Sequence, residues 1–251
     1  MVDQATLARV NLNAVLRAVE ELPLLDVASR RIAEGKPETV QFIVGGIGKA
    51  RLAIGDGKIR FLGGGGHSSI VLWFPKPENF NAMFAGKGGP IPLKGFTKIG
   101  WLKDEFTSLT ERLAYYLKPD AKLLAGKNYR TANSVLSLHV AAYAISEVGN
   151  HDADGRLNAA RMADGGLLVA AKGGPELTVE VKGKTLRTMK GATEMVRARM
   201  IFPGIEEAGA MLRGELNPYE AIGTGKISLS GFTPLIDHVN KVLGLVPRYL
   251  G

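Results

Sequence analysis

The feature that most constrains this chain is a segment that occurs twice. Residues 70–99 align without gaps with residues 198–227, at a constant offset of 128. Random pairing over such a length would give about two identities. The sequence has ten: Phe74/Phe202, Pro75/Pro203, Glu78/Glu206, Ala82/Ala210, Met83/Met211, Gly86/Gly214, Pro90/Pro218, Gly95/Gly223, Lys98/Lys226 and Ile99/Ile227. An internal repeat of this kind predicts two tandem copies of one structural unit.

The repeat also predicts where the copies divide. The segment LKPDAKLLAGK at residues 117–127 separates two helical patterns, so we expect unit 1 over residues 1–122 and unit 2 over residues 123–251. Upstream, Gly45-Gly46 matches Gly173-Gly174 at the same offset, and Gly57-Lys58 matches Gly183-Lys184 after a slip of two residues. Half of a 251-residue chain is long enough to bury its own core.

Hydrophobic periodicity predicts the same order of elements in each unit. An opening helix comes first, followed by strands, a short helix ended by glycine, a last strand and a closing helix. In unit 1 the strands are expected at residues 40–44, 50–54, 59–62, 69–74 and 98–102, and the last strand of unit 2 at 226–230. The predicted fold class is therefore α+β, with a mostly antiparallel or mixed sheet and helices on one face.

Composition excludes several classes of protein. The chain has no cysteine, so disulfides, thiolate metal sites and cysteine nucleophiles are absent. The first residues lack the pattern of a signal peptide, and the longest apolar stretch, residues 135–148, is too short and too polar to span a bilayer, so we expect a cytoplasmic protein. The net charge of +8 is compatible with transient contact with an anionic membrane surface. It predicts no nucleic-acid binding, because no basic cluster has interleaved aromatic residues.

Catalytic and metal-binding motifs are missing from the sequence. It contains no Walker phosphate loop, no GxGxxG, no GxSxG and no HExxH. The four histidines, His67, His139, His151 and His238, are too far apart in sequence to form a local metal pair. We therefore predict no catalytic residue, no metal and no cofactor, and expect that the protein is not an enzyme.

The stretch from the third strand to the last strand resembles the sterol carrier protein 2 family. Unit 2 follows the family pattern in FPGIEEAGAMLRGELNPYEAIGTGKISLSG, through Gly214, Asn217, Pro218, Gly225, Lys226, Ile227, Leu229 and Gly231. Unit 1 keeps Gly86, Pro90, Lys98 and Ile99, and departs from the pattern at Gly89 and Lys103. The resemblance implies two tandem sterol-carrier-like units, each with an apolar cavity between sheet and helices. Such a cavity would bind or transfer a fatty acid, acyl-CoA, sterol or phospholipid without catalysis.

The candidate lipid-binding residues are the apolar side chains expected to face that cavity. Unit 1 is the better candidate because its aromatic residues are larger and more numerous, although bulk can equally close a cavity. The expected set in unit 1 is Phe42, Leu72, Phe74, Phe80, Met83, Phe84, Ile99, Trp101, Leu109 and Leu113. The expected set in unit 2 is Met200, Phe202, Met211, Leu212, Ile227, Leu229, Leu243 and Val246.

Two other functions remain open at the level of sequence. The chain could be an interaction or oligomerisation module with filled cavities and no ligand, including a homodimer. It could also act on acyl or CoA substrates, which would require a polar cluster that the sequence does not show. Filled cavities together with a large apolar outer patch would favour the interaction module.

Overall fold

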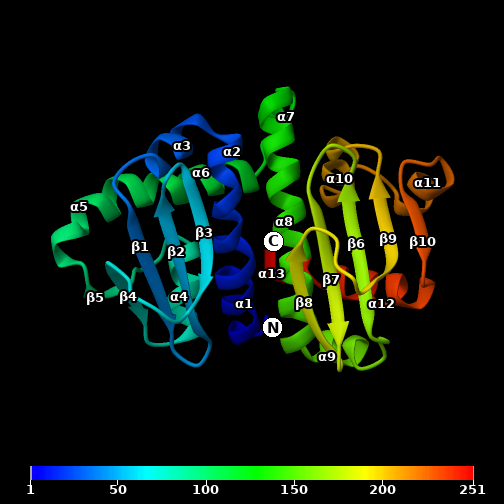
Figure 1. Cartoon of the computed structure of the whole chain (residues 1–251), viewed down its shortest axis with the longest axis horizontal. Helices are drawn as coiled ribbons and strands as arrows, with labels where there is room; N and C mark the ends of the chain where they lie inside the picture. Colours follow the sequence, from blue (N-terminus) through cyan, green and yellow to red (C-terminus); the bar gives the residue numbers. More distant parts are fainter. Residues whose placement is uncertain (1, 251) are drawn as a thin grey trace. The chain divides into compact units, whose positions relative to one another are not determined.

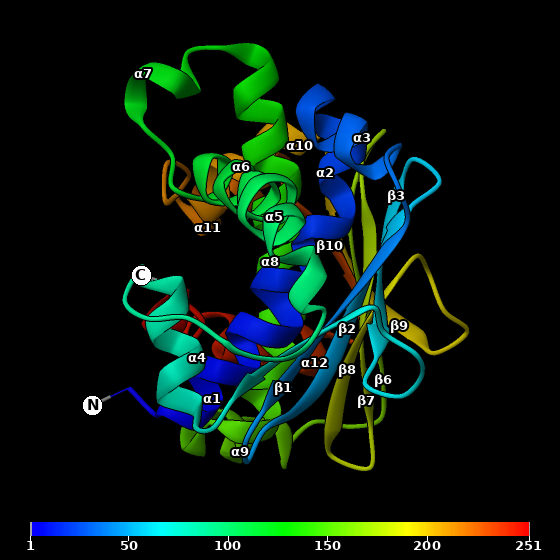
Figure 2. The same ribbon diagram turned by 90° about the vertical axis from the view of Figure 1, so that its left-hand side faces the viewer.

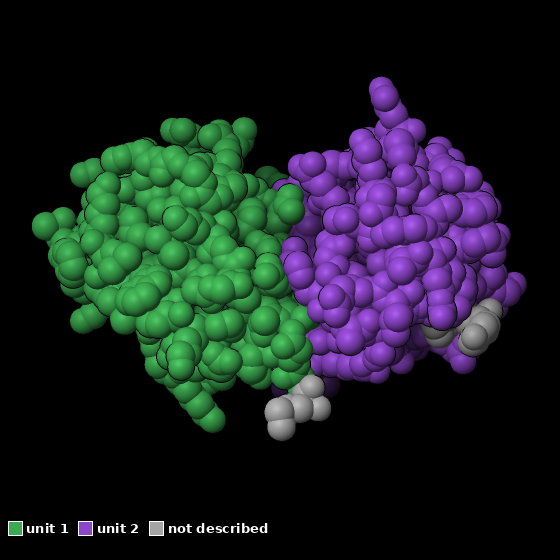
Figure 3. All heavy atoms as spheres, turned by 90° about the horizontal axis from the view of Figure 1, so that it is seen from below, with its two compact units in different colours: residues 1–118 green, residues 119–251 purple. Residues whose placement is uncertain are grey.

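The chain divides into two compact units, residues 1–118 and residues 119–251 (Figure 1, Figure 3). The computed structural model describes residues 2–250, apart from the side chains of residues 218 and 219. The division falls four residues before the boundary expected from the sequence.

Unit 1 opens with a continuous helical segment and continues with a sheet and further helices. Its helical segments before the sheet are α1 (Gln4–Val10), η1 (Asn11–Val15), η2 (Leu16–Glu21), α2 (Leu22–Leu25) and α3 (Val27–Ala33). The strands are β1 (Glu38–Val44), β2 (Gly48–Gly55), β3 (Lys58–Gly63), β4 (Ile70–Phe74) and β5 (Ile91–Lys94). The remaining helical segments are α4 (Pro77–Phe84), η3 (Phe96–Lys98), α5 (Ile99–Trp101), η4 (Leu102–Phe106) and α6 (Thr107–Leu117). Figure 2 shows α1, α4 and α6 on the same side of β1.

Unit 2 has the same succession of layers. Its helices are α7 (Ala121–Leu124), α8 (Lys127–His151), α9 (Ala153–Ala159), α10 (Ile205–Leu212), α11 (Pro218–Gly223), α12 (Thr233–Leu243) and α13 (Pro247–Leu250). Its strands are β6 (Gly165–Ala171), β7 (Glu176–Lys182), β8 (Thr185–Lys190), β9 (Val196–Phe202) and β10 (Ser228–Gly231).

The two sheets have one topology. Strand order is β3-β2-β1-β4-β5 in unit 1 and, read in the same sense, β8-β7-β6-β9-β10 in unit 2. The central pair is parallel in each sheet, β1 with β4 and β6 with β9, and every other neighbouring pair is antiparallel. The prediction of an α+β fold with mixed, mostly antiparallel sheets is confirmed.

A two-residue hairpin joins the second and third strands of each sheet. Its two central residues have positive φ in both units: Asp56 and Gly57 at 55° and 71°, Gly183 and Lys184 at 55° and 68°. Such backbone angles match the right-handed twist of the flanking strands. Gly183 therefore corresponds to Asp56 rather than to Gly57, and the offset between units here is 127. The sequence alignment of Gly57-Lys58 with Gly183-Lys184 was wrong by one residue.

The predicted last strand of unit 1 at residues 98–102 was wrong. These residues are helical, lying in η3, α5 and η4, and the fifth strand is β5, seven residues earlier. The cause is an unequal loop: residues 85–90 link α4 to β5, whereas residues 213–227, which include α11, link α10 to β10. The gapless alignment therefore fails beyond Gly86 and Gly214. Ile99 is exposed and Ile227 is buried, so they are not equivalent.

The counterpart in unit 1 of Gly231, the last glycine of the family pattern in unit 2, is Gly95. Gly95 and Gly231 both have left-handed φ angles, 92° and 89°. A Cβ at Gly95 would lie 3.1 Å from the carbonyl oxygen of Ser69, and one at Gly231 would lie 2.2 Å from that of Arg197. Because Ser69 and Arg197 are themselves 128 residues apart, each glycine packs on the same point of its sheet. The surrounding sequences, LKGFT at residues 93–97 and LSGFT at residues 229–233, agree at this offset of 136.

Candidate functional site

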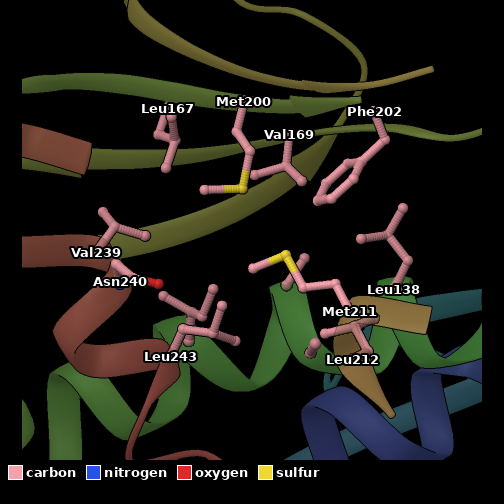
Figure 4. A pocket seen from close by; sticks show the side chains of 13 residues that line it. Leu138, Leu167, Val169, Met200, Phe202, Met211, Leu212, Val239, Asn240 and Leu243 are labelled. Atoms are coloured by element: carbon pink, nitrogen blue, oxygen red, sulfur yellow. The ribbon is translucent and has the colours of Figure 1, made fainter. Parts of the chain in front are cut away.

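Unit 2 contains an apolar cavity of about 40 Å³ between its sheet and its helices. Five elements contribute to its wall: β6 and β9 from the sheet, and α8, α10 and α12 from the helical layer. Figure 4 shows the sheet side chains on one side of the space and those of α10 and α12 on the other. The lining residues are Leu138, Ala141, Ala142, Ile145, Leu167, Val169, Met200, Phe202, Met211, Leu212, Val239, Asn240 and Leu243.

Simple periodicities bring these side chains together. Leu167 and Val169 on β6 are two residues apart, so they point to one face of the sheet, and Val169 is paired with Met200 on β9. On α8, residues 138, 141, 142 and 145 follow the i, i+3, i+4, i+7 spacing of one helix face. The cavity is thus the place where the inner face of the sheet meets one stripe of α8.

The cavity reaches the surface between α10 and α12. Met211, Leu212 and Leu243 are half-buried, Asn240 is exposed, and the sheet residues behind them are buried. Asn240 is the one polar side chain among the thirteen lining residues, and it lies at the mouth. In Figure 4 the sulfur atoms of Met200 and Met211 point into the space from opposite walls. Two unbranched thioether side chains make this part of the wall adaptable.

Polar contacts on the side of α10 that faces away from the cavity hold α10 against α8. Arg130 forms an ion pair with Glu206, and Arg213 donates to the side-chain oxygen of Asn133 over 2.9 Å. Gly209 allows the close approach, since a Cβ there would lie 1.8 Å from the Ser134 hydroxyl oxygen. These contacts anchor α10 to α8 near both ends of α10.

Aromatic rings occupy the corresponding region of unit 1. Phe42, Phe74 and Phe80 are fully buried. The Phe80 ring centroid lies 4.9 Å from that of Phe74, 5.2 Å from Phe84 and 6.5 Å from Phe42. Phe42 also lies 5.9 Å from Phe106, whose ring is 6.1 Å from that of Trp101. These contacts form one continuous aromatic cluster beneath the sheet.

Two substitutions between the units explain why the cavity lies in unit 2. Phe42 is paired with Leu72, and Val169 is paired with Met200, 128 residues beyond Leu72, so Phe42 and Val169 are equivalent. The helices α4 and α10 correspond at the same offset, which makes Ala208 the counterpart of Phe80. Val169 and Ala208 are much smaller than two phenylalanines, and Val169 is one of the residues that line the cavity, whereas Ala208 is buried and is not among them.

Five of the residues predicted for unit 2 line the cavity: Met200, Phe202, Met211, Leu212 and Leu243. The other three lie elsewhere: Ile227 is buried just before β10, Leu229 lies on β10, and Val246 is buried after α12. The sequence reasoning omitted residues of α8 and β6, although the helical spacing of Leu138, Ala142 and Ile145 was visible. It had not placed a strand at residues 165–171.

The residues predicted for unit 1 lie mostly in its core. Phe42, Leu72, Phe74, Phe80, Leu109 and Leu113 are buried, and Met83, Phe84 and Trp101 are half-buried. Ile99 and Trp101 do not lie on the inner face of a strand, because α5 replaces the strand that was expected there. Ile99 is exposed and belongs to the surface.

In each unit an aspartate fastens the last helix to the short helix that follows the opening helical segment; Asp26 is buried and Asp152 is half-buried. Asp26 accepts hydrogen bonds from Ser29 N and Oγ, from Arg112 Nε at 3.0 Å and from Tyr116 OH at 3.1 Å. Burial disfavours its charge, but the hydrogen bonds from Arg112 and Ser29 outweigh it and lower the Asp26 pKa to about 2. In unit 2, Asp152 accepts from Gly155 N at 2.9 Å and from Tyr249 OH at 2.6 Å.

One serine lies beside a buried carboxylate. Ser69 Oγ donates to Glu38 at 2.7 Å and accepts from Thr39 N, while Lys98 forms an ion pair with Glu38. Burial opposes the charge of Glu38, yet the hydrogen bonds from Lys98 and Ser69 lower its pKa. A carboxylate held in its charged form by a lysine is a poor proton acceptor, so this cluster serves to tie β1, β4 and η3 together. Among residues 2–250, no three His, Asp or Glu side chains gather as metal ligands would.

Comparisons with known proteins give likenesses to solved structures alone. Neither a protein-family model nor a curated protein sequence matches this chain. It is similar to a structure described as a UbiJ-SCP2 ubiquinone synthesis protein, at 13% identity and a TM-score of 0.33, over 41% of this chain and 85% of that one. It is also similar to sterol carrier protein 2 like 2 from Aedes aegypti, at 18% identity and a TM-score of 0.29, over 43% of this chain and 96% of that one.

A larger enzyme is also among these structures. The sec-alkylsulfatase Pisa1 from Pseudomonas sp. is 13% identical, with a TM-score of 0.27, over 59% of this chain and 28% of the sulfatase. As for membrane-spanning segments, the described helices include none with the length and apolar character needed to cross a bilayer.

Proposed function

We propose that unit 2 is a non-catalytic lipid-binding unit that holds an acyl chain between its sheet and the helices α10 and α12. The observation that carries this proposal is the cavity itself: twelve of its thirteen lining side chains are apolar, and the polar one, Asn240, lies at the mouth. This arrangement suits a ligand with an apolar tail and a polar head that stays in water.

The size of the cavity indicates how a ligand would enter. A volume of about 40 Å³ is far smaller than an acyl chain, and an apolar space of this kind stays dry. Binding therefore requires Met200 and Met211 to change rotamer and α12 to move outward. Burying ten methylene groups would stabilise the complex by about 8 kcal/mol, against an association cost of about 4–15 kcal/mol. Long chains are therefore the expected ligands, with modest affinity.

The aromatic packing of unit 1 is the reason that we propose the site in unit 2, although the sequence had favoured unit 1. Phe42, Phe74 and Phe80 fill the space beneath the first sheet, and opening it would mean separating rings that already contact one another. Unit 1 instead exposes an apolar patch on residues 91–99.

We also propose that the two units are tandem copies of one ancestral domain. Four features support the duplication: the shared strand topology, the positive-φ hairpin between the second and third strands, the glycine followed by Phe-Thr, and the aspartate that receives a hydrogen bond from a C-terminal tyrosine. The cytoplasmic location of the protein remains a prediction from its sequence.

A substitution taken from unit 1 tests the lipid-binding proposal. Val169→Phe restores in unit 2 the ring that Phe42 supplies in unit 1, and it should block the cavity. If the ring displaces two methylene groups of the ligand, the loss of about 1.6 kcal/mol weakens binding more than tenfold. The measurement is titration with cis-parinaric acid, followed by displacement with palmitic acid.

The matched control is Ile201→Phe, which adds a ring at a half-buried position between Met200 and Phe202, on the opposite face of the same strand. It should bind cis-parinaric acid as the unchanged protein does. Equal binding by Val169→Phe and the unchanged protein, with no lipid detected by mass spectrometry of an organic extract, would exclude this site.

A further inference from the structure

Unit 1 exposes a cluster of large apolar side chains within nine consecutive residues. These are Ile91 and Leu93 on β5, Phe96 at the start of η3, and Ile99 on α5, with 46%, 52%, 63% and 39% of their surfaces exposed. We call them the 91–99 patch. Ile91 and Leu93 lie on either side of Pro92 in β5, whose register is irregular opposite Val71 and Leu72. Phe96 and Ile99 are three residues apart across successive helical turns.

Unit 2 shows that the fold does not require this exposure. At the equivalent of Phe96, the Phe232 ring is half-buried beneath Arg197, whose guanidinium carbon lies 4.4 Å from the ring centroid. The equivalent of Arg197 in unit 1 is Ser69, whose short side chain is bound to Glu38 and cannot cover a ring. At the offset of 136, the counterparts of Ile91 and Ile99 are Ile227 and Leu235, which are buried, and the counterpart of Leu93 is Leu229, which is half-buried. The patch is therefore a feature of unit 1 alone.

The segment around the patch carries one sign of charge. Residues 79–103 contain four lysines, Lys87, Lys94, Lys98 and Lys103, and no aspartate or glutamate. Lys87 and Lys103 are exposed, Lys94 donates to the carbonyl oxygen of Ser68, and Lys98 pairs with Glu38. Apolar side chains interleaved with lysines match a lipid bilayer whose head groups are anionic and whose interior is apolar.

The strand that carries half of the patch is poorly suited to pairing with another protein. β5 is an edge strand, and it contains Pro92, which lacks an N–H donor, and the charged Lys94. Proline and lysine on an edge strand oppose the addition of a further strand. An anionic bilayer makes no demand for backbone pairing, so these residues do not hinder it.

We propose that the 91–99 patch docks unit 1 on an anionic lipid bilayer. Ile91, Leu93, Phe96 and Ile99 enter the interface between head groups and acyl chains, and the exposed Lys87 and Lys103 contact anionic head groups. Each lysine near such a surface contributes about fivefold to binding, and salt screens that contribution. This inference does not depend on the cavity of unit 2, because it concerns a different unit and a different surface.

Co-sedimentation of the full chain with lipid vesicles tests the docking. One set of vesicles is phosphatidylcholine, and the other is phosphatidylcholine mixed with phosphatidylserine. We expect the protein to bind the mixed vesicles and to be released by high salt. The double variant Leu93→Ser/Phe96→Ser should lose at least tenfold of this binding, whereas the control Leu24→Ser/Leu157→Ser should stay within twofold. Leu24 and Leu157 are 74% and 61% exposed and lie outside the patch.

A second readout reports insertion directly. Trp101 lies two residues beyond Ile99, so in a Trp73→Phe background its emission should shift to the blue on mixed vesicles. Circular dichroism establishes that each variant is folded. Binding by the double variant equal to that of the unchanged protein would overturn the proposal, and so would equal binding to neutral vesicles. Sedimentation equilibrium that shows a dimer dissociated by Phe96→Ser would assign the patch to a second copy of the chain instead.

Discussion

Removing the Phe80 side chain should destabilise unit 1 more than any other single truncation in its aromatic cluster. The ring has no exposed surface, and it contacts Phe42, Phe74 and Phe84. Truncating a fully buried phenylalanine to alanine costs about 3–5 kcal/mol, through lost burial and the cavity that remains. Since rings from the sheet and from α4 all surround Phe80, little of that cavity can collapse, and we expect a value near the upper end of this range.

Tryptophan fluorescence isolates the effect to one unit. Trp73 and Trp101 are the two tryptophans of the chain, and both lie in unit 1. Emission during urea unfolding therefore follows unit 1 even if the two units unfold separately. With a urea dependence of about 2 kcal/mol per molar, Phe80→Ala should lower the midpoint by roughly 2 M. It should also create in unit 1 a cavity that binds cis-parinaric acid.

The control is Phe96→Ala, which truncates a ring of the same kind at an exposed position. It should change the stability of unit 1 by no more than about 0.5 kcal/mol. A Phe80→Ala midpoint that matches the Phe96→Ala midpoint would mean that the aromatic cluster does not form the core of unit 1. The explanation that aromatic rings fill the region of unit 1 that corresponds to the cavity of unit 2 would then also fail.

Three further predictions concern the polar and glycine positions that the units share. Because the Asp26 pKa is lowered from 3.8 to about 2, the ionised carboxylate stabilises the folded state above pH 4, and this contribution is lost as the pH falls toward 2. The free energy of unfolding, followed by tryptophan fluorescence, should drop by up to about 2 kcal/mol over that range, and by less in Asp26→Asn. Tyr249→Phe removes the tyrosine hydrogen bond to Asp152 and should lower the stability of unit 2 by about 1.5–3 kcal/mol, whereas Tyr116→Phe should lower that of unit 1 by less, because Arg112 still binds Asp26. Hydrogen exchange of the α9 and α3 amides compares the two variants, and equal losses would show that Arg112 does not compensate. Gly231→Ala places a Cβ 2.2 Å from a backbone oxygen at a left-handed φ, and it should lower the stability measured by calorimetry by more than about 2 kcal/mol. Gly65→Ala, with open space around it and no positive φ, should leave the stability unchanged. An unchanged stability of Gly231→Ala would refute the close approach.

Local periodicity was sufficient to predict much of the fold. Alternation of Ile70, Leu72 and Phe74 places these three residues on one face of β4, and all three are buried. The short helix after Phe74 recurs after Phe202 with identical length, and its position was readable from the offset of 128. Strand alternation and helix spacing depend on neighbours within a few residues, so they can be read from the chain without its partners.

The fifth strand of unit 1 was mispredicted because an alignment without gaps cannot represent loops of different length. The repeated Gly-Phe-Thr at residues 95–97 and 231–233 would have corrected it, since its offset of 136 reveals the shorter loop. The reason for that glycine, a backbone oxygen close to where a Cβ would be, is visible only when β4 and the segment after β5 are brought together.

The sequence by itself predicted the order of the elements, the likeness of residues 70–86 to residues 198–214, and which strand residues share a face. The tertiary structure alone showed that unit 2 has an apolar cavity in the region where unit 1 has packed aromatic rings. Phe42 and Phe80 meet across the inner face of the first sheet, whereas Val169 and Ala208 stand at the same places in unit 2. Whether space remains depends on the combined volume of side chains from distant segments, and no local pattern encodes that sum.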